Sequence, residues 1–186
     1  MKDLIKSIKQ QKINCATESG FVFVLNFDVE WRKGGYATMQ PFIAIENENL
    51  SEEYYRFQQE AWGHYEHFQP DKSEMYQMMF KIPSVNYGDN YYGEHQLSTA
   101  IEQYKVAFKH KCLEDFKDIK SVPELRDYLF DDRLIGGPAR SFFEMYLASK
   151  YMSREEFLMI KHNDSKASQE AQKFFLERIY GDKSGN

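Results

Sequence analysis

Cysteine, proline and long apolar runs are scarce in this sequence of 186 residues. Two cysteines are too few for a disulfide scaffold, and 5 prolines with 10 glycines exclude collagen-like and low-complexity chains. The longest unbroken apolar run is Phe21–Leu25, whereas a helix that spans a bilayer needs about 20 apolar residues. The first residues, Met1–Ser7, lack the apolar core of a signal peptide. We therefore expect a soluble, cytoplasmic protein.

Motifs that mark common enzyme sites are also absent. There is no Gly-x-Ser-x-Gly elbow, no glycine-rich phosphate loop and no dinucleotide-binding fingerprint. Hydrophobic residues make up 42% of the chain, which is enough to form a core. The sequence therefore predicts a single globular domain over residues 1–186 without a cofactor, and it favours a binding protein over an enzyme.

Acidic residues predominate and are concentrated in one stretch. The chain has 29 acidic and 24 basic residues, a net charge of −5, which argues against nucleic acid as a partner. Between Pro41 and Glu94 there are ten acidic residues and three basic ones, so this stretch has a net charge of −7 and the rest of the chain +2. Such a local acidic field attracts a basic partner. A solvated helix face with loops would give the same pattern.

Alternating apolar and polar residues predict an antiparallel hairpin early in the chain. Every second residue of Phe21–Trp31 is apolar, the pattern of a half-buried strand whose second face becomes polar toward its end. A following glycine pair predicts a turn, and Tyr36–Glu46 the returning strand. Pro41 cannot donate a backbone hydrogen bond, so it indicates a sheet edge, a bulge or a break. A third strand is predicted over Met75–Ile82.

Helical spacing dominates the second half of the chain. Apolar residues recur every three or four positions over Leu97–Ile119. Capping boxes at Ser121 and Ser153 predict two helix starts, and a helix with Ser51 as N-cap is predicted to run to about Phe68. Further helices are predicted over Lys2–Lys12 and Ser165–Tyr180. This order indicates an α+β fold: an N-terminal antiparallel β-hairpin plus a third strand, packed with a helical C-terminal half.

A tyrosine-rich segment is the strongest candidate for a binding site. Ser84–Glu94 has neither a helical nor a strand period, and it is predicted to be an exposed loop. Tyrosine provides a large, rigid contact area at low entropic cost. The same tyrosines could instead cover the core and expose only their hydroxyls. The candidate partner-binding residues in this loop and in the acidic stretch before it are Glu46, Glu48, Glu52, Glu53, Tyr87, Asp89, Tyr91, Tyr92 and Glu94.

A metal site is the main alternative. Glu60, His64 and His67 share one face of a predicted helix, and a carboxylate with two imidazoles is a ligand set that zinc accepts. These residues would serve a metal-assisted hydrolase. Gly63 weakens the helix between them, and a half-exposed polar face explains the same spacing.

The two cysteines have no metal-site spacing, because neither Cys15 nor Cys112 has a histidine or cysteine at a zinc-like separation. Cys112 falls in the apolar stripe and is expected to be a small buried residue. A Cys–His pair formed only in the folded chain stays open as an alternative.

The predicted short helix followed by the Phe21–Trp31/Tyr36–Glu46 hairpin resembles small bacterial α+β domains found beside secreted toxins. The acidic balance and the helical tail are similar to those of toxin-neutralising immunity proteins. The resemblance covers about the first 50 residues, rests on architecture, and carries over no family residue. It implies a cytoplasmic protein that binds and blocks one toxin domain and has no catalytic site.

Taken together, these features predict a protein-binding inhibitor. Its acidic, tyrosine-rich surface would meet a protein with a basic surface, with no role for nucleic acid or membrane. A self-associating structural protein with aromatic residues buried in its own interface is a further alternative.

Overall fold

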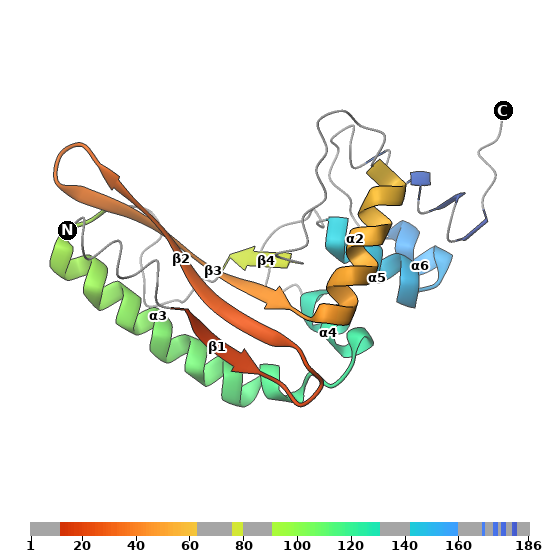
Figure 1. Cartoon of the computed structure of the whole chain (residues 1–186), viewed down its shortest axis with the longest axis horizontal. Coiled ribbons are helices and arrows are strands. Elements are labelled where there is room, and N and C mark those ends of the chain that lie inside the picture. Colours follow the sequence, from red (N-terminus) through yellow and green to blue (C-terminus); the bar gives the residue numbers. More distant parts are fainter. Residues whose placement is uncertain are drawn as a thin grey trace. The chain divides into compact units, whose positions relative to one another are not determined.

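The chain forms two compact units in the computed structural model, which describes residues 12–62, 76–79, 91–130, 142–159, 169, 173–174, 176–177 and 180–181 (Figure 1). The sheet unit comprises Met1–Asn47 and Tyr76–Ile119, and the helical unit comprises Glu48–Met75 and Lys120–Asn186. The polypeptide therefore passes between the units three times. Each unit is described by itself, and a single domain over residues 1–186 stays a prediction.

A long hairpin forms the centre of the sheet unit. Strands β2 (Val22–Arg32) and β3 (Tyr36–Glu46) have eleven residues each and pair antiparallel over their whole length. Gly34 and Gly35 in the connecting turn have φ angles of 110° and 84°, a region that glycine enters at little cost. The predicted hairpin and its glycine turn are confirmed.

Three short strands complete the sheet. Strand β1 (Ile13–Ala16) pairs with β2, whereas β4 (Tyr76–Met79) and β5 (Tyr91–Tyr92) both pair with β3, at different places along it. Pro41 lies between the residues of β3 that pair with β4 and those that pair with β5. The predicted third strand is confirmed as β4.

The predicted loop over Ser84–Glu94 is corrected at its C-terminal end. Tyr91 and Tyr92 are strand residues, because both align with β3, and Glu94 already belongs to helix α3. Residues 84–90 lie outside the described part of the chain. Pairing with a strand more than fifty positions earlier in the sequence created β5, so local periodicity did not predict it.

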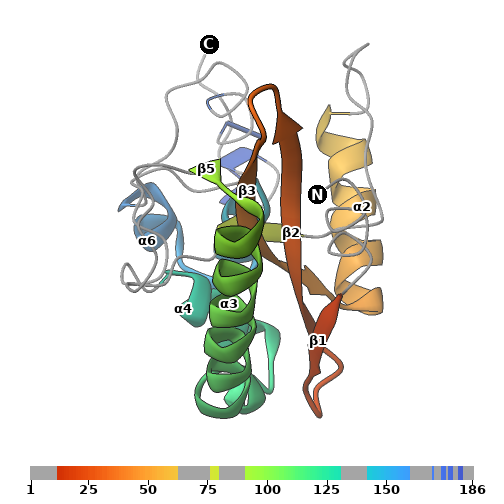
Figure 2. The same cartoon turned by 90° about the vertical axis from the view of Figure 1, so that its left-hand side faces the viewer.

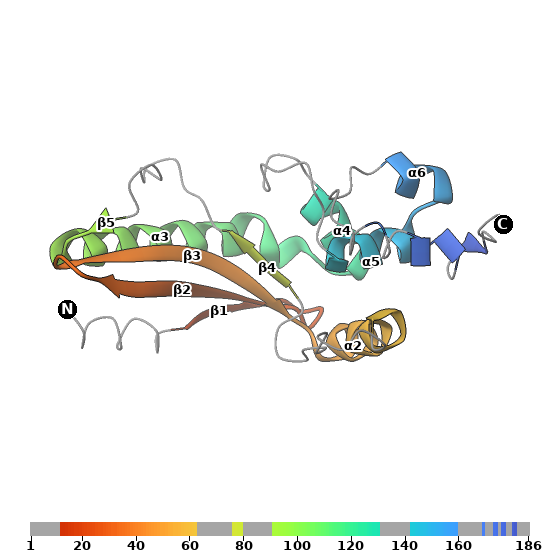
Figure 3. The ribbon, with the colours of Figure 1, turned by 90° about the horizontal axis from the view of Figure 1, so that it is seen from above.

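Helix α3 (Glu94–Glu114) covers one face of the hairpin, as Figures 2 and 3 show. The predicted apolar stripe provides its buried side, and the Tyr104 ring meets Phe27 of β2 edge-on at 6.2 Å. After Glu114 the helix tightens into the 3₁₀ turn η1 (Phe116–Asp118). There the Phe116 ring stacks on Phe23 of β2, with 4.0 Å between ring centroids and 4° between planes. The buried residues of α3 are Leu97, Ala100, Ile101, Tyr104 and Phe108.

The helical unit contains α2 (Glu48–Trp62), α4 (Val122–Phe130), α5 (Phe142–Tyr151) and α6 (Arg154–Met159). An aromatic cluster joins α2 to α5. Tyr54 contacts Phe143 with ring centroids 5.1 Å apart, and Phe57 contacts Tyr146 at 4.9 Å. The strands thus precede most of the helices in the sequence, which confirms the α+β fold class.

Helix α2 begins earlier than predicted. Ser51 was expected to be its N-cap, but the helix starts at Glu48, so Ser51 lies inside it. Asn47 directly precedes the helix, and asparagine is at least as good an N-cap residue as serine. Residues 63–68, where the predicted helix ends, and 2–11 of the predicted first helix lie outside the described residues.

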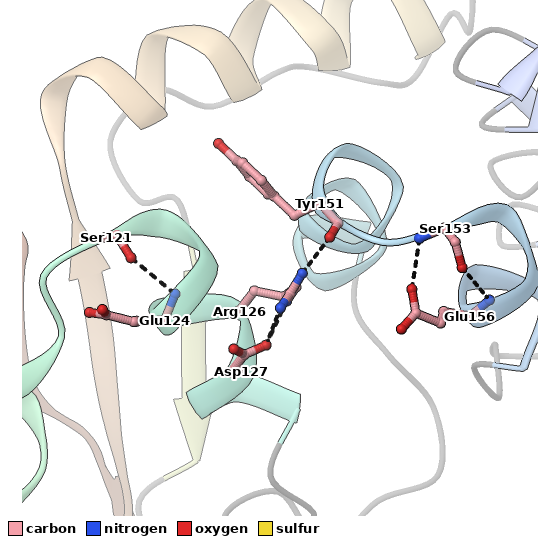
Figure 4. A network of polar contacts seen from close by, with 7 residues as sticks. All are labelled: Ser121, Glu124, Arg126, Asp127, Tyr151, Ser153 and Glu156. Carbon is pink, nitrogen blue, oxygen red and sulfur yellow. Dashed lines mark hydrogen bonds and ion pairs between the residues drawn. The ribbon is translucent and has the colours of Figure 1, made fainter.

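Helices begin after both predicted N-cap serines, and the complete capping box is present at Ser153 (Figure 4). The backbone N–H of Glu156 donates to Ser153 Oγ at 3.3 Å, and the N–H of Ser153 donates to the Glu156 carboxylate at 2.8 Å. This contact holds the pKa of Glu156 below its usual value. At Ser121 one half of the predicted box is present: the N–H of Glu124 donates to Ser121 Oγ, whereas the Glu124 carboxylate accepts from the N–H of Lys120.

The Arg126 guanidinium links α4 to α5 (Figure 4). It donates to the backbone carbonyl of Tyr151 at 2.5 Å, and it pairs with the carboxylate of Asp127. The contact satisfies a carbonyl at the C-terminal end of α5, where no further turn of helix supplies an N–H to donate to it. Among the described helices, none is both long enough and apolar enough to cross a membrane.

We expect Phe116→Ala to lower the free energy of unfolding by about 3–5 kcal/mol, because it removes a fully buried ring and leaves a cavity against Phe23. The measurement is urea unfolding followed by circular dichroism. Leu113→Ala is the matched control, because that side chain is 68% exposed and should change stability by less than about 0.5 kcal/mol. Equal effects of the two substitutions would contradict the role given to the Phe23–Phe116 stack.

Candidate functional site

The face of the hairpin opposite α3 carries the candidate site. Beyond Asn26 the even-numbered residues of β2 are exposed, whereas Phe27 and Val29 are buried. In register with them on β3 lie Thr38 and Gln40, and Tyr91 of β5 aligns with Thr38. Together they line an open depression of about 460 Å³. This surface, the hairpin face, consists of Asp28, Glu30, Arg32, Thr38, Gln40 and Tyr91, and the buried Met39 also borders the depression.

Charges on the hairpin face are mixed, with an excess of acid. Two carboxylates, Asp28 and Glu30, accompany one guanidinium, Arg32. Arg32 contacts Glu30 at 2.5 Å, and both side chains are 53% exposed. An ion pair this accessible to water contributes at most about 1 kcal/mol to stability, so a charged partner group could displace it at small cost.

Tyr91 is the most prominent aromatic side chain of the hairpin face. It is 59% exposed, and its ring stands edge-on to Tyr36 with centroids 4.8 Å apart. The Tyr36 contact and the strand pairing both restrict the orientation of the Tyr91 ring. A tyrosine held in this way loses little conformational entropy when a partner covers it.

The predicted binding residues within the sheet unit do not form one patch. Tyr92 is only 9% exposed and belongs to the core beside Ala37, so it presents no side chain to a partner. Glu94 is exposed in the first turn of α3, where a negative charge is favourable. Glu46 ends β3 eight residues beyond Thr38, about 26 Å away along the strand. Tyr87 and Asp89 lie outside the described residues.

The other predicted acids belong to α2 and have structural contacts in the helical unit. Glu48 lies in the first turn of the helix, and Glu52 pairs with Arg56 at 3.2 Å. Glu53 pairs with Lys150 of α5 and accepts a hydrogen bond from the Tyr146 hydroxyl at 3.2 Å. Glu53 therefore joins α2 to α5 at the edge of the aromatic cluster.

This contact changes the pKa values of its members. The hydrogen bond from Lys150 holds the pKa of Glu53 below its usual value, although partial burial acts in the opposite direction. Burial raises the pKa of Tyr146 to about 12. Burial alone would lower the pKa of Lys150, but the Glu53 carboxylate together with Tyr146 and Tyr151 outweighs burial, and the net shift is upward. The ammonium and the carboxylate both stay charged at neutral pH.

Sequence reasoning did not assign Asp28, Glu30, Thr38 or Gln40 to the site. The alternation in β2 already placed Asp28 and Glu30 on its polar side. It did not reveal that Tyr91 would lie beside them, because that depends on the pairing of β5 with β3. Of the nine predicted residues, Tyr91 alone lines the depression within the described part of the chain.

The metal alternative stays a prediction. Glu60 is an exposed residue of α2, and His64 and His67 lie outside the described residues. Within residues 12–62 and the other described segments, no three histidine, cysteine, aspartate or glutamate side chains are arranged to hold a metal ion.

Comparison with protein-family models, with curated proteins and with solved structures found no match to this chain.

We expect Glu53→Gln to lower the free energy of unfolding at pH 7 by about 0.5–1 kcal/mol, because it removes a partly exposed ion pair with Lys150. The folded-state pKa of Glu53 is lowered, so its contribution is complete above the unfolded value of about 4.3 and is lost as the pH falls through the folded value. Urea midpoints of wild type and variant should therefore differ at pH 7 and converge near pH 3. Glu52→Gln is the control, and a difference that persists at low pH would contradict the assignment.

Proposed function

We propose that this protein is a protein-binding inhibitor whose hairpin face covers a basic surface of its partner. The observation that supports the proposal is the depression in which the exposed Tyr91 stands beside Asp28 and Glu30. A rigid aromatic anchor among acidic groups is suited to a cationic protein surface, where it combines buried area with electrostatic attraction.

Rigidity of the surface supports a binding role. The side chains come from two strands paired over eleven positions, so their spacing is set before the partner arrives. Binding to a preorganised surface avoids the entropic cost of ordering a loop. A stable interface covers about 800 Å² on each partner, which exceeds one depression. Tyr36 aligns with Arg32 and meets Tyr91 edge-on, so it extends this face with a residue type common at binding hot spots. Trp31 aligns with the buried Ala37 and belongs to the other face of the hairpin.

The class of partner follows from the resemblance to immunity proteins stated above. Such a protein would bind one toxin domain and block it, and an acidic face would suit a basic active site such as that of a nuclease. We assign the acidic binding surface to the hairpin face in place of α2. The proposed class of partner stays the same, and the residues that would bind it are different. Of the nine residues predicted earlier, Tyr91 stays a leading candidate, and Asp28, Glu30 and Tyr36 join it in place of the others.

We expect tagged wild-type protein to capture one stoichiometric basic protein from native lysate. The triple variant Asp28→Asn, Glu30→Gln, Tyr91→Ala should weaken that complex by at least about 30-fold, equivalent to about 2 kcal/mol. Affinity is measured by calorimetry or biolayer interferometry with the purified partner. Raising the salt from about 0.05 M to about 0.5 M should slow association of the wild type more than of the triple variant.

The control is the double variant Glu48→Gln, Glu52→Gln, which removes the same charge from α2 and should bind as the wild type does. If this control loses affinity and the triple variant keeps it, the hairpin face is the wrong surface. The partner's own activity should fall in proportion to added wild-type protein. A partner that binds with unchanged activity would argue against an inhibitor.

A further inference from the structure

The two cysteines of the chain, about a hundred positions apart in sequence, meet in the sheet unit. Cys15 is the third residue of β1 and aligns with Phe23 of β2. Paired residues of neighbouring strands point to the same face, so Cys15 faces the side on which Phe23 stacks on Phe116. Cys112 lies on α3 four residues before Phe116 and one turn after the buried Phe108. Strand β1 packs against both α3 and η1, and this packing makes the Cys15 and Cys112 thiols neighbours.

Contacts beyond the thiols hold this corner together. In the turn after β1, Ser19 donates to the backbone carbonyl of Ile119, directly after η1, at 2.7 Å. Ser19 also hydrogen-bonds the Thr17 hydroxyl at 2.7 Å, and the N–H of Phe21 donates to Thr17 Oγ1. The strand that carries Cys15 is thus tied to the segment that follows Cys112. The sulfurs stay close because the surrounding structure is fixed, not because of their own weak contact.

Both thiols are half-buried and unoxidised. Strand β1 is four residues long and forms the end of the described sheet, paired with β2 on one side. A short edge strand can move by the small distance that separates a thiol contact from an S–S bond of about 2.05 Å. Cys15 is only half-buried, so a small oxidant can reach part of its side chain.

We propose that Cys15 and Cys112 form a reversible intramolecular disulfide that locks β1 onto α3, with a small-molecule disulfide such as glutathione disulfide as oxidant. In the first step the Cys15 thiolate attacks one sulfur of the oxidant, forms a mixed disulfide and releases one glutathione thiolate. In the second, Cys112 loses its proton and attacks the Cys15 sulfur, and the second glutathione leaves. Two protein thiols become one disulfide, two glutathiones are produced, and the two thiol protons end on them.

The order of the two steps follows from the surroundings of Cys112. Burial, and then the neighbouring Cys15 sulfur, raise the pKa of the Cys112 thiol well above its usual value. Since the thiolate is the reactive form, Cys112 is a poor first nucleophile. It reacts once the mixed disulfide at Cys15 has placed an electrophilic sulfur beside it.

The test uses the full chain, reduced and then incubated with glutathione disulfide. Remaining thiols are labelled with a maleimide and counted by intact-mass spectrometry. We expect monomer with either two labels or none, and peptide mapping should identify a Cys15–Cys112 bond. The oxidised form should melt about 5 °C or more above the reduced form, because a cross-link between distant residues restricts the unfolded chain.

Single variants test the order of reaction. Cys112→Ala should accumulate a glutathione adduct at Cys15, whereas Cys15→Ala should react at Cys112 at least about tenfold more slowly. Neither variant should gain thermal stability on oxidation. Circular dichroism of both variants establishes that they are folded before the rates are compared.

Three results would overturn the inference. One is independent loss of the two thiols, seen as singly labelled protein in quantity. Another is a disulfide that forms only between two copies of the chain. The third is native protein that keeps both thiols under oxidant conditions that oxidise the urea-unfolded chain.

Discussion

The register of the β2–β3 pairing is the constraint on which the rest of the sheet unit depends. It aligns Phe27 with Pro41 and Asp28 with Gln40, and so sends apolar side chains to the α3 side and polar ones to the other. Because side chains alternate along a strand, a slip of one residue would exchange these two sets. Phe23 would then lose its stack with Phe116, and Asp28 and Glu30 would be buried without water. The same register therefore stabilises the core and forms the proposed binding surface.

The half of the hairpin far from its turn forms core, whereas the half near the turn carries the proposed binding surface. Near the start of β2 and the end of β3, both faces are buried, as Val24 and Ala44 show. Nearer the turn only one face is buried, and there the depression lies. A surface built on the far end of a well-anchored hairpin gains rigidity from residues that never touch the partner. Mutations in the buried half should consequently alter stability first and affinity only as a result.

Local patterns predicted much of this structure, and long-range contacts account for what was missed. The hairpin, its glycine turn, the α3 stripe and the helix starts after Ser121 and Ser153 depend on residues within a few positions of one another. Strands β1 and β5 exist because they pair with distant strands, and neither has a distinctive sequence of its own. The residue type of Tyr91 was enough to predict it as a binding residue. That Asp28 and Glu30 line the same depression follows only from the pairing of β5 with β3. The meeting of Cys15 with Cys112 likewise depends on the folded chain.

The order in which the chain is synthesised has a consequence for the hairpin. Its second strand ends at Glu46, but α3 does not extend to Phe108 until about sixty residues later, after the first part of the helical unit. At a synthesis rate of about 5–20 residues per second, the apolar face of the nascent hairpin stays uncovered for roughly 3–12 s before its covering helix has been synthesised. During that interval the nascent chain exposes Phe23, Phe27 and Val29, a surface that chaperones recognise and that invites aggregation. The topology thus concentrates the risk of aggregation in the seconds between synthesis of the hairpin and synthesis of α3.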